Sequence, residues 1–306
     1  MNDAPHITLS SWIMIILLAL VWGGTFLVTE VALRGMTPFW LAASRIGFAA
    51  LLMTGVWGVR GFRLFAAPPD RGVWAALIFV GAVSSVVPFS LLAWGQQFVT
   101  SGFAGVSMAS TALIVLPLAH FMVEGERMNL RKLVGFLTGF AGVCILIGGQ
   151  AFESTDAAME TPGRIACFGA ACCYATSGIF MRRLPRVDPL GLAAVLLVIG
   201  AALILPLAAL VEGAPPMASR DTLLVLAFLG LVPTAAASVL RVLVVRSAGP
   251  VFMSLVNYQV PVWSVVLGTL ILGEPLPHSL LAALSLILAG VAISQYGAIK
   301  RLFTRA

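Results

Sequence analysis

Residues 125–145 read GERMNLRKLVGFLTGFAGVCI, and residues 273–293 read GEPLPHSLLAALSLILAGVAI. The opening Gly-Glu, the later Ala-Gly-Val and the final Ile are identical at a constant offset of 148. Self-similarity at one fixed spacing indicates a repeated structural unit. The pair of segments therefore predicts that the chain consists of two related halves.

Two further matches keep almost the same offset. Residues 38–43 and 189–194 share four identities at offset 151, and Phe79 with Gly81 matches Phe228 with Gly230 at offset 149. We therefore expect a first repeat over residues 1–150 and a second over residues 151–306.

The composition is that of a membrane protein. Of the 306 residues, 60% are apolar and 10% are charged, with a mean hydropathy of +1.04, whereas soluble domains have about a quarter of their residues charged. A membrane-spanning helix needs roughly 20 apolar residues, and ten segments qualify. They are residues 12–33, 38–59, 73–93, 102–123, 133–149, 165–181, 190–211, 223–245, 251–272 and 280–299. The expected fold is an all-α integral membrane protein of two five-helix repeats.

The basic residues indicate how these spans are oriented. With the N-terminus inside, the cytoplasmic segments hold thirteen Lys and Arg residues and the outer segments three; basic residues are retained on the cytoplasmic side. Because each half has an odd number of spans, the second half is inverted. Sixteen of the eighteen basic residues are Arg, as in proteins from GC-rich genomes. We expect a bacterial inner membrane protein with both termini in the cytoplasm.

These motifs resemble those of the drug/metabolite transporter superfamily, EamA type. The similarity rests on the two Gly-Glu…Ala-Gly-Val segments, on Trp22-Gly23 in the first span and on Pro-x-x-x-Ala-x-x-Arg over residues 38–45. It implies a central cavity formed by spans one to four and six to nine, with spans five and ten at the periphery. It also implies export of small metabolites by alternating access around a site between inverted repeats. Among such exporters, the chain resembles those of aromatic amino acids.

Ionisable residues within spans are candidates for function, because an unpaired charge there is costly. Arg45 either attracts a substrate carboxylate or pairs with Glu30, and Arg241 is close enough to the cytoplasmic end to reach headgroups. Glu126 and Glu274 either cap the helices that follow them or couple transport to protons. We expect Glu30, Arg45 and Arg241 to be structural or gating charges.

Polar and aromatic residues at mid-span are candidates for substrate binding. Asn257 shares a helix face with other polar residues of the ninth span, and such a face points at protein or water. The candidates are Trp22, Ser107, Ser110, Thr111, Tyr174, Asn257 and Tyr258. The alternatives are hydrogen bonding between helices for the polar residues and core packing for Trp22 and Tyr174. The small-residue face of Gly135 and Gly139 suits either docking within the monomer or dimerisation.

The predicted function is export of amino acids, including neutral and aromatic ones. The other possibilities are export of a drug cation or a nucleotide sugar, and a lipid-modifying membrane enzyme. An enzyme needs a metal site or a nucleophile with a base, and no span supplies either set. We expect no cofactor, no metal and no nucleic-acid partner; the partners are membrane lipids and a small-molecule substrate, with the protein as monomer or homodimer.

Overall fold

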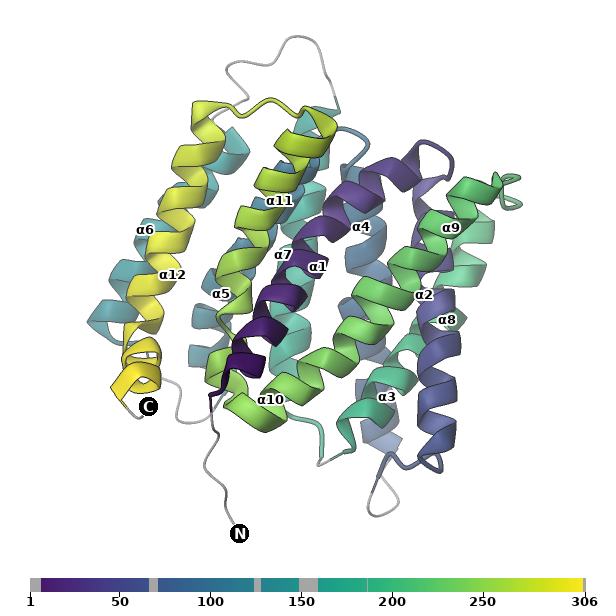
Figure 1. Ribbon diagram of the computed structural model, residues 1–306, viewed down its shortest axis with the longest axis horizontal. Helices are drawn as coiled ribbons and strands as arrows, with labels where there is room; N and C mark the ends of the chain where they lie inside the picture. Colours follow the sequence, from purple (N-terminus) through teal and green to yellow (C-terminus); the bar gives the residue numbers. More distant parts are fainter. Residues whose placement is uncertain (1–6, 66–70, 124–127, 149–158, 186, 305–306) are drawn as a thin grey trace.

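A computed structural model describes residues 7–65, 71–123, 128–148, 159–185 and 187–304, and these form a bundle of helices (Figure 1). Apart from one isolated bridge between Phe65 and Val187, the described part contains no extended pairing. The helices of the first half are α1 (Leu9–Leu33), α2 (Pro38–Val59), α3 (Arg71–Gly81), η1 (Ala82–Val86), α4 (Val87–Gly95), α5 (Ser101–Met122) and α6 (Leu130–Gly148). Those of the second half are α7 (Glu160–Met181), α8 (Pro189–Glu212), α9 (Arg220–Leu229), η2 (Gly230–Ala236), α10 (Ala237–Met253), α11 (Val256–Leu272) and α12 (His278–Thr304).

The predicted spans are found, and the fold class is confirmed. Nine helices of the described residues are long and apolar enough to cross a membrane, and α11 is an apolar helix of 17 residues. The start of α1 and the end of α12 lie at one end of the bundle, here called the terminal end (Figure 1). The opposite end, here called the far end, carries the turns at 34–37, 96–100, 213–219 and 273–277.

Two predicted boundaries are wrong. The helix of the ninth span, α11, begins at Val256 and not at residue 251, because residues 254 and 255 form a turn, and the helical segment before that turn is kinked at Gly249, whose φ is 87°. The sixth span begins at Glu160 and not at residue 165. Arg164, expected in a loop, therefore lies inside α7 with 1% of its surface exposed, where it pairs with Glu160 and donates to the Ile147 carbonyl at 3.0 Å.

The third and eighth spans each contain a π-helical segment at the same place in the repeat. An offset of 149 superposes η1 on residues 231–235 of η2. Pro233 lacks an N–H, so the Leu229 carbonyl loses its helical partner, and the Thr234 hydroxyl donates to that carbonyl at 2.8 Å. In η1 the Ser85 hydroxyl donates to the Gly81 carbonyl at 2.8 Å. Such π segments occur often at functional sites.

The inverted repeat is also visible in helix packing. A Cβ on Gly81 would lie 2.9 Å from Ile199 of α8, and a Cβ on Gly230 would lie 2.5 Å from Phe48 of α2. The two glycines are repeat equivalents, and so are Phe48 and Ile199 at offset 151. The same glycine contact thus joins each π-helical span to the second span of the other half.

The Gly135 and Gly139 face packs inside the monomer, which resolves the choice that the sequence left open. A Cβ on Gly290 of α12 would lie 2.5 Å from the Gly135 carbonyl oxygen and 2.5 Å from the Gly139 nitrogen. Helices α6 and α12 form one edge of the bundle (Figure 1), as expected for spans five and ten. Small residues permit this backbone approach, which drives helix association in lipid.

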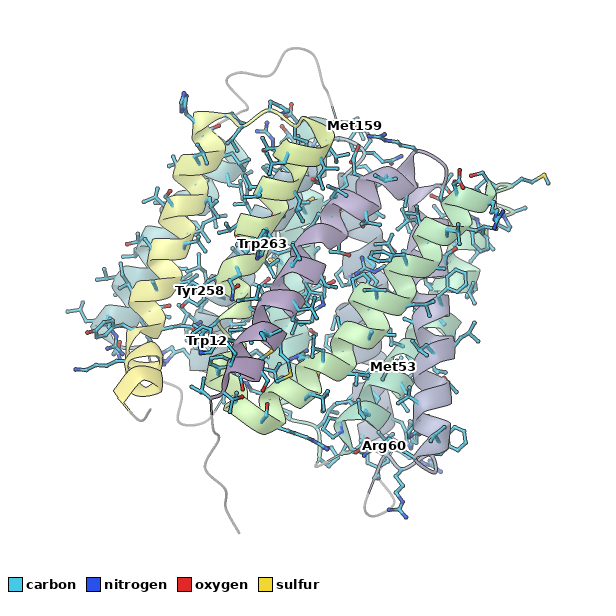
Figure 2. All side chains as sticks on the ribbon, in the orientation of Figure 1. Trp12, Met53, Arg60, Met159, Tyr258 and Trp263 are labelled. Atoms are coloured by element: carbon cyan, nitrogen blue, oxygen red, sulfur yellow. The ribbon has the colours of Figure 1, made fainter. Side chains whose placement is uncertain are left out.

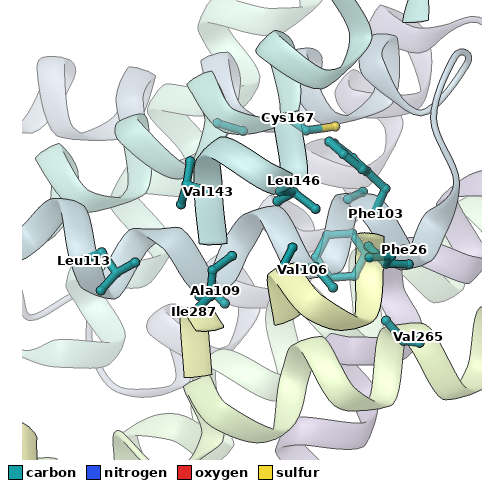
Figure 3. Packing of buried hydrophobic residues seen from close by; sticks show 14 of the residues in the cluster. Phe26, Phe103, Val106, Ala109, Leu113, Val143, Leu146, Cys167, Val265 and Ile287 are labelled. Atoms are coloured by element: carbon teal, nitrogen blue, oxygen red, sulfur yellow. The ribbon is translucent and has the colours of Figure 1, made fainter. Parts of the chain in front are cut away.

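Apolar side chains of α1, α5, α6, α7, α11 and α12 pack together behind this edge (Figure 3). Phe26, Phe103 and Leu113 are at most 5% exposed, and Val143 and Ile287 join them from α6 and α12. This cluster holds the peripheral helix pair against the rest of the bundle.

Candidate functional site

Arg45 is a buried cation in the middle of the bundle, and it does not form the expected ion pair with Glu30. Only 7% of Arg45 is exposed. Its Nε donates to the Thr234 hydroxyl oxygen at 2.9 Å, and its Cζ lies 4.0 Å from the centroid of the Phe89 ring. The Glu30 Oε2 atom is buried and has no hydrogen-bond partner. The predicted pairing is therefore wrong.

The guanidinium of Arg45 has unused donors. Its Nε bond to Thr234 is its one hydrogen bond within the described residues, and none of their carboxylates lies within 4.0 Å of it. The Thr234 hydroxyl gives its own proton to Leu229, so it compensates no charge. A guanidinium presents five donors, of which two can hold a carboxylate side by side. Arg45 is therefore equipped to bind an anion.

Two further aromatic residues are linked to this cation through its neighbours Phe89 and η2. The Phe89 and Tyr174 rings meet edge to face at 6.5 Å between centroids. The Trp22 indole donates to the Pro233 carbonyl at 3.0 Å, so Trp22 and Arg45 bind adjacent residues of η2. We call these six residues the Arg45 cluster: Trp22, Arg45, Phe89, Tyr174, Pro233 and Thr234. It draws on α1, α2, α4, α7 and η2, and so on both halves.

Three predicted hydroxyl residues lie in helix interfaces instead. Ser107 donates to the Phe103 carbonyl of its own helix at 2.9 Å and is 1% exposed. Ser110 is fully buried, and its hydroxyl oxygen has no partner. Thr111 donates across to the Ala171 carbonyl of α7 at 3.5 Å. The structure does not bring these three hydroxyls into contact with the Arg45 cluster through any hydrogen bond between described residues.

The two candidates of the ninth span point to different surroundings. The Tyr258 hydroxyl donates to the Val291 carbonyl of α12 at 3.2 Å, and the residue lies in the half of α11 nearer the terminal end (Figure 2). Asn257 is exposed in the first turn of α11, where its backbone N–H donates to the Ser254 carbonyl at 3.1 Å. Asn257 therefore lies near the terminal end and not at mid-span, because α11 begins later than the sequence predicts.

Arg241 is exposed on α10. It precedes Arg246 by five residues, or ~8 Å along the helix, and Arg246 lies 3.9 Å from Asp188 in the turn before α8 at the terminal end. This depth agrees with a side chain that extends towards the headgroups.

Glu274 caps a helix, but not the one that follows it. Its carboxylate accepts from the backbone N–H groups of Ser101 at 2.8 Å and Gly102 at 3.0 Å, at the start of α5. Glu212, which the sequence did not single out, caps α2 through Phe39 and Trp40, each at 3.1 Å. A carboxylate is stabilised at such a helix N-terminus. Glu126, the repeat equivalent of Glu274, lies outside the described residues.

Sequence reasoning missed Phe89, Pro233 and Thr234 of the Arg45 cluster. One signal was available: offset 149 pairs Thr234 with Ser85, so hydroxyls recur at the same place in both repeats. Phe89 has no comparable signal, because its position depends on how α4 packs.

The fold is that of a multi-pass membrane protein in which a buried arginine and aromatic residues from two related halves lie together. The chain belongs to the EamA-like transporter family, whose model matches residues 9–148 and again residues 161–296. The family expected from the sequence motifs is thereby confirmed.

Several known proteins are similar over most of their length. The uncharacterized transporter YoaV of Bacillus subtilis is 22% identical over 284 residues, which cover 92% of this chain and 95% of YoaV. The uncharacterized inner membrane transporter YedA of Escherichia coli K12 is 25% identical over 284 residues, covering 92% and 89%. One crystal structure, 22% identical, has a TM-score of 0.66 and covers 94% of this chain and 98% of its own; it supports the fold.

Proposed function

We propose that this transporter exports amino acids, including neutral and aromatic ones, from a bacterial cell by alternating access in the inner membrane. The observation that carries the proposal is the Arg45 guanidinium, which is buried against Phe89 and has no carboxylate partner among the described residues. A substrate carboxylate would replace the missing counter-ion. Trp22, Phe89 and Tyr174 then offer aromatic faces to an apolar or aromatic side chain.

The charge of the Arg45 cluster separates this substrate class from its rivals. A drug cation would be repelled by an uncompensated guanidinium. A nucleotide sugar carries several phosphate charges, whereas the Arg45 cluster contains one cation. A single carboxylate matches that one cation.

The two π-helical segments, of which η2 contains Pro233, support alternating access. Pro233 and Thr234, which accept hydrogen bonds from Trp22 and Arg45, lie in the π segment η2. The segment η1 is its repeat equivalent. We propose that the third and eighth spans bend there when the site opens to one side or the other. Asn257, exposed near the terminal end, remains a proposed residue of the pathway.

The proposal is tested with cells that express the protein on a panel of toxic analogues of aromatic, aliphatic and basic amino acids. Expression should raise resistance to the neutral and aromatic analogues relative to an empty vector. Purified protein in liposomes should then exchange labelled substrate. Resistance to cationic drugs, with no effect on any amino-acid analogue, would contradict the proposed substrate class.

The proposed orientation predicts which turns are accessible from outside the cell. In a background without Cys144, Cys167, Cys172 and Cys173, a cysteine replacing Met217 in the turn after α8 should react with an impermeant maleimide in intact cells. A cysteine replacing Phe62 in the turn after α2 should react only after permeabilisation. The two positions are exposed, at 103% and 58%, at opposite ends of the bundle. The reverse pattern would invert the topology, and labelling of both in intact cells would contradict the ten-span arrangement.

A further inference from the structure

A second polar region lies at the far end, apart from the Arg45 cluster. A cavity of about 300 Å³ is formed there by the end of α1, the connection between α4 and α5 and the end of α11. The charged residues that line it are Glu30, Arg34 and Glu274. The connection contributes only uncharged residues, among them Gln96 and Thr100.

Two buried oxygen atoms in this lining have no hydrogen-bond donor. Gln96 is 3% exposed, and its Nε2 donates to the Phe26 carbonyl at 2.9 Å, but its Oε1 has no partner. The Glu30 Oε2 atom is likewise buried without a partner. Leaving a buried acceptor unsatisfied costs about 1–3 kcal/mol, and more if it is charged. The lining therefore lacks a positively charged or hydrogen-donating species.

The charges do not balance either. The carboxylate of Glu274 is held at the start of α5, where each of its oxygens accepts a hydrogen bond from a backbone N–H group. Arg34 is the one cation among the described lining residues. With Glu30 and Glu274 both ionised, the lining carries one uncompensated negative charge, and like charges in one site favour protonation of one of them. Both oxygens of Glu274 already accept hydrogen bonds, whereas the Glu30 Oε2 atom has no partner, so Glu30 is the carboxyl group with a free position for a proton.

We propose that this cavity is a proton-binding site in which Glu30 takes up and releases one proton in each transport cycle. The proton comes from the solution at the far end, forms an O–H bond on the Glu30 carboxylate and returns to water when that bond breaks. No other group changes its oxidation state or its covalent bonds. As a statement about a transport cycle, the inference rests on the proposed function, but proton binding itself does not.

Helix α1 connects the proton site with the Arg45 cluster. Trp22 lies eight residues before Glu30, or ~12 Å along the helix, and it binds the Pro233 carbonyl in η2. Neutralising Glu30 removes its repulsion from Glu274, which is attached to α5. Protonation therefore changes the force between α1 and α5 at the far end, while the same helix contacts the hinge at η2.

The first test needs no substrate. Purified protein in weakly buffered detergent is titrated from pH 8 to pH 5 with a pH-indicator dye. Wild-type protein should bind about one more proton per chain than Glu30→Gln, since one carboxyl group is removed. The matched control is Asp221→Asn, which removes an exposed carboxylate near the same end that does not line the cavity; a loss of uptake as large as that of Glu30→Gln would contradict the assignment to Glu30. Equal uptake by wild type and Glu30→Gln would overturn the proposal.

A second variant leaves Glu30 in place. Arg34 is exposed, and Arg34→Gln removes the cation of the lining, so the additional proton should bind at higher pH. An unchanged titration midpoint in that variant would also count against the site. The titration is repeated with sodium in place of choline to test whether the cavity binds a proton or a metal cation. If sodium displaces the proton, the cavity is a metal-cation site and the proton assignment is wrong.

The transport arm separates this inference from the proposed function. In liposomes, a pH gradient should accelerate substrate transport by wild type but not by Glu30→Gln. With the same pH on both sides of the membrane, Glu30→Gln should still exchange substrate. Loss of exchange as well would place Glu30 in substrate binding and contradict a coupling role. If no amino acid is transported by any form while the proton difference persists, the substrate proposal fails and the proton site stands.

Discussion

Replacing Arg45 with methionine is expected to lower transport of aromatic amino acids by about 30- to 150-fold. A hydrogen bond to a charged group contributes ~1.5–3 kcal/mol, and loss of a paired carboxylate contact of ~2–3 kcal/mol gives that factor. Methionine keeps much of the side-chain volume that packs on Phe89. Because Arg45 has no carboxylate partner among the described residues, the variant should melt at or above the wild-type temperature.

Three comparisons make this result specific. Arg45→Lys keeps the charge but lacks the planar fork and the stacking, so it should retain part of the transport. Arg241→Met removes another arginine of a span and should change transport less than twofold, because Arg241 is exposed and outside the Arg45 cluster. An aromatic amine without a carboxylate, used as a competitor, should act at least as strongly on Arg45→Met as on wild type, because the guanidinium that repels its ammonium group is removed. If Arg45→Met reduces the transport of all substrates equally and also melts at a lower temperature, Arg45 is a structural residue.

Replacing Gly290 with alanine is expected to cause a large loss of stability. The new Cβ would meet backbone atoms of Gly135 and Gly139, each at 2.5 Å, and not the end of a flexible side chain. Helices α6 and α12 would have to separate, and overpacking of this kind costs about 1–3 kcal/mol, occasionally more. We expect a clear fall in the melting temperature in detergent and a lower membrane yield.

Gly178→Ala on α7 is the matched control, because nothing lies within 4 Å of a Cβ built there. It should melt close to wild type and gain slightly from the better helix propensity of alanine. A Gly290→Ala protein that melts like Gly178→Ala would show that α6 and α12 do not pack through these glycines. A change of oligomeric state in Gly290→Ala would instead indicate that the same glycine face packs between two chains.

The spans and the repeat could be predicted because they rest on local and periodic features. Runs of about 20 apolar residues identify a spanning helix whatever packs around it. Identical residues also recur in the two halves of the sequence at offsets of 148–151. The boundaries failed where local geometry overrode composition. Residues 251–253 are apolar, yet a kink at Gly249, with a φ of 87°, precedes them and a turn at residues 254 and 255 separates them from α11.

The sequence by itself determined the membrane class, the two inverted halves and the family, since these follow from hydropathy, charge distribution and repeated motifs. It also identified Arg45, Trp22 and Tyr174 as residues of interest. Only the tertiary structure decided which polar groups are consumed by packing and which are left for a ligand. The Arg45 Nε finds Thr234 across 189 residues of sequence, whereas Tyr258 is bound to α12. Hydrogen-bond partners in a membrane are supplied by other helices, so the use of a polar side chain depends on contacts that no local pattern contains.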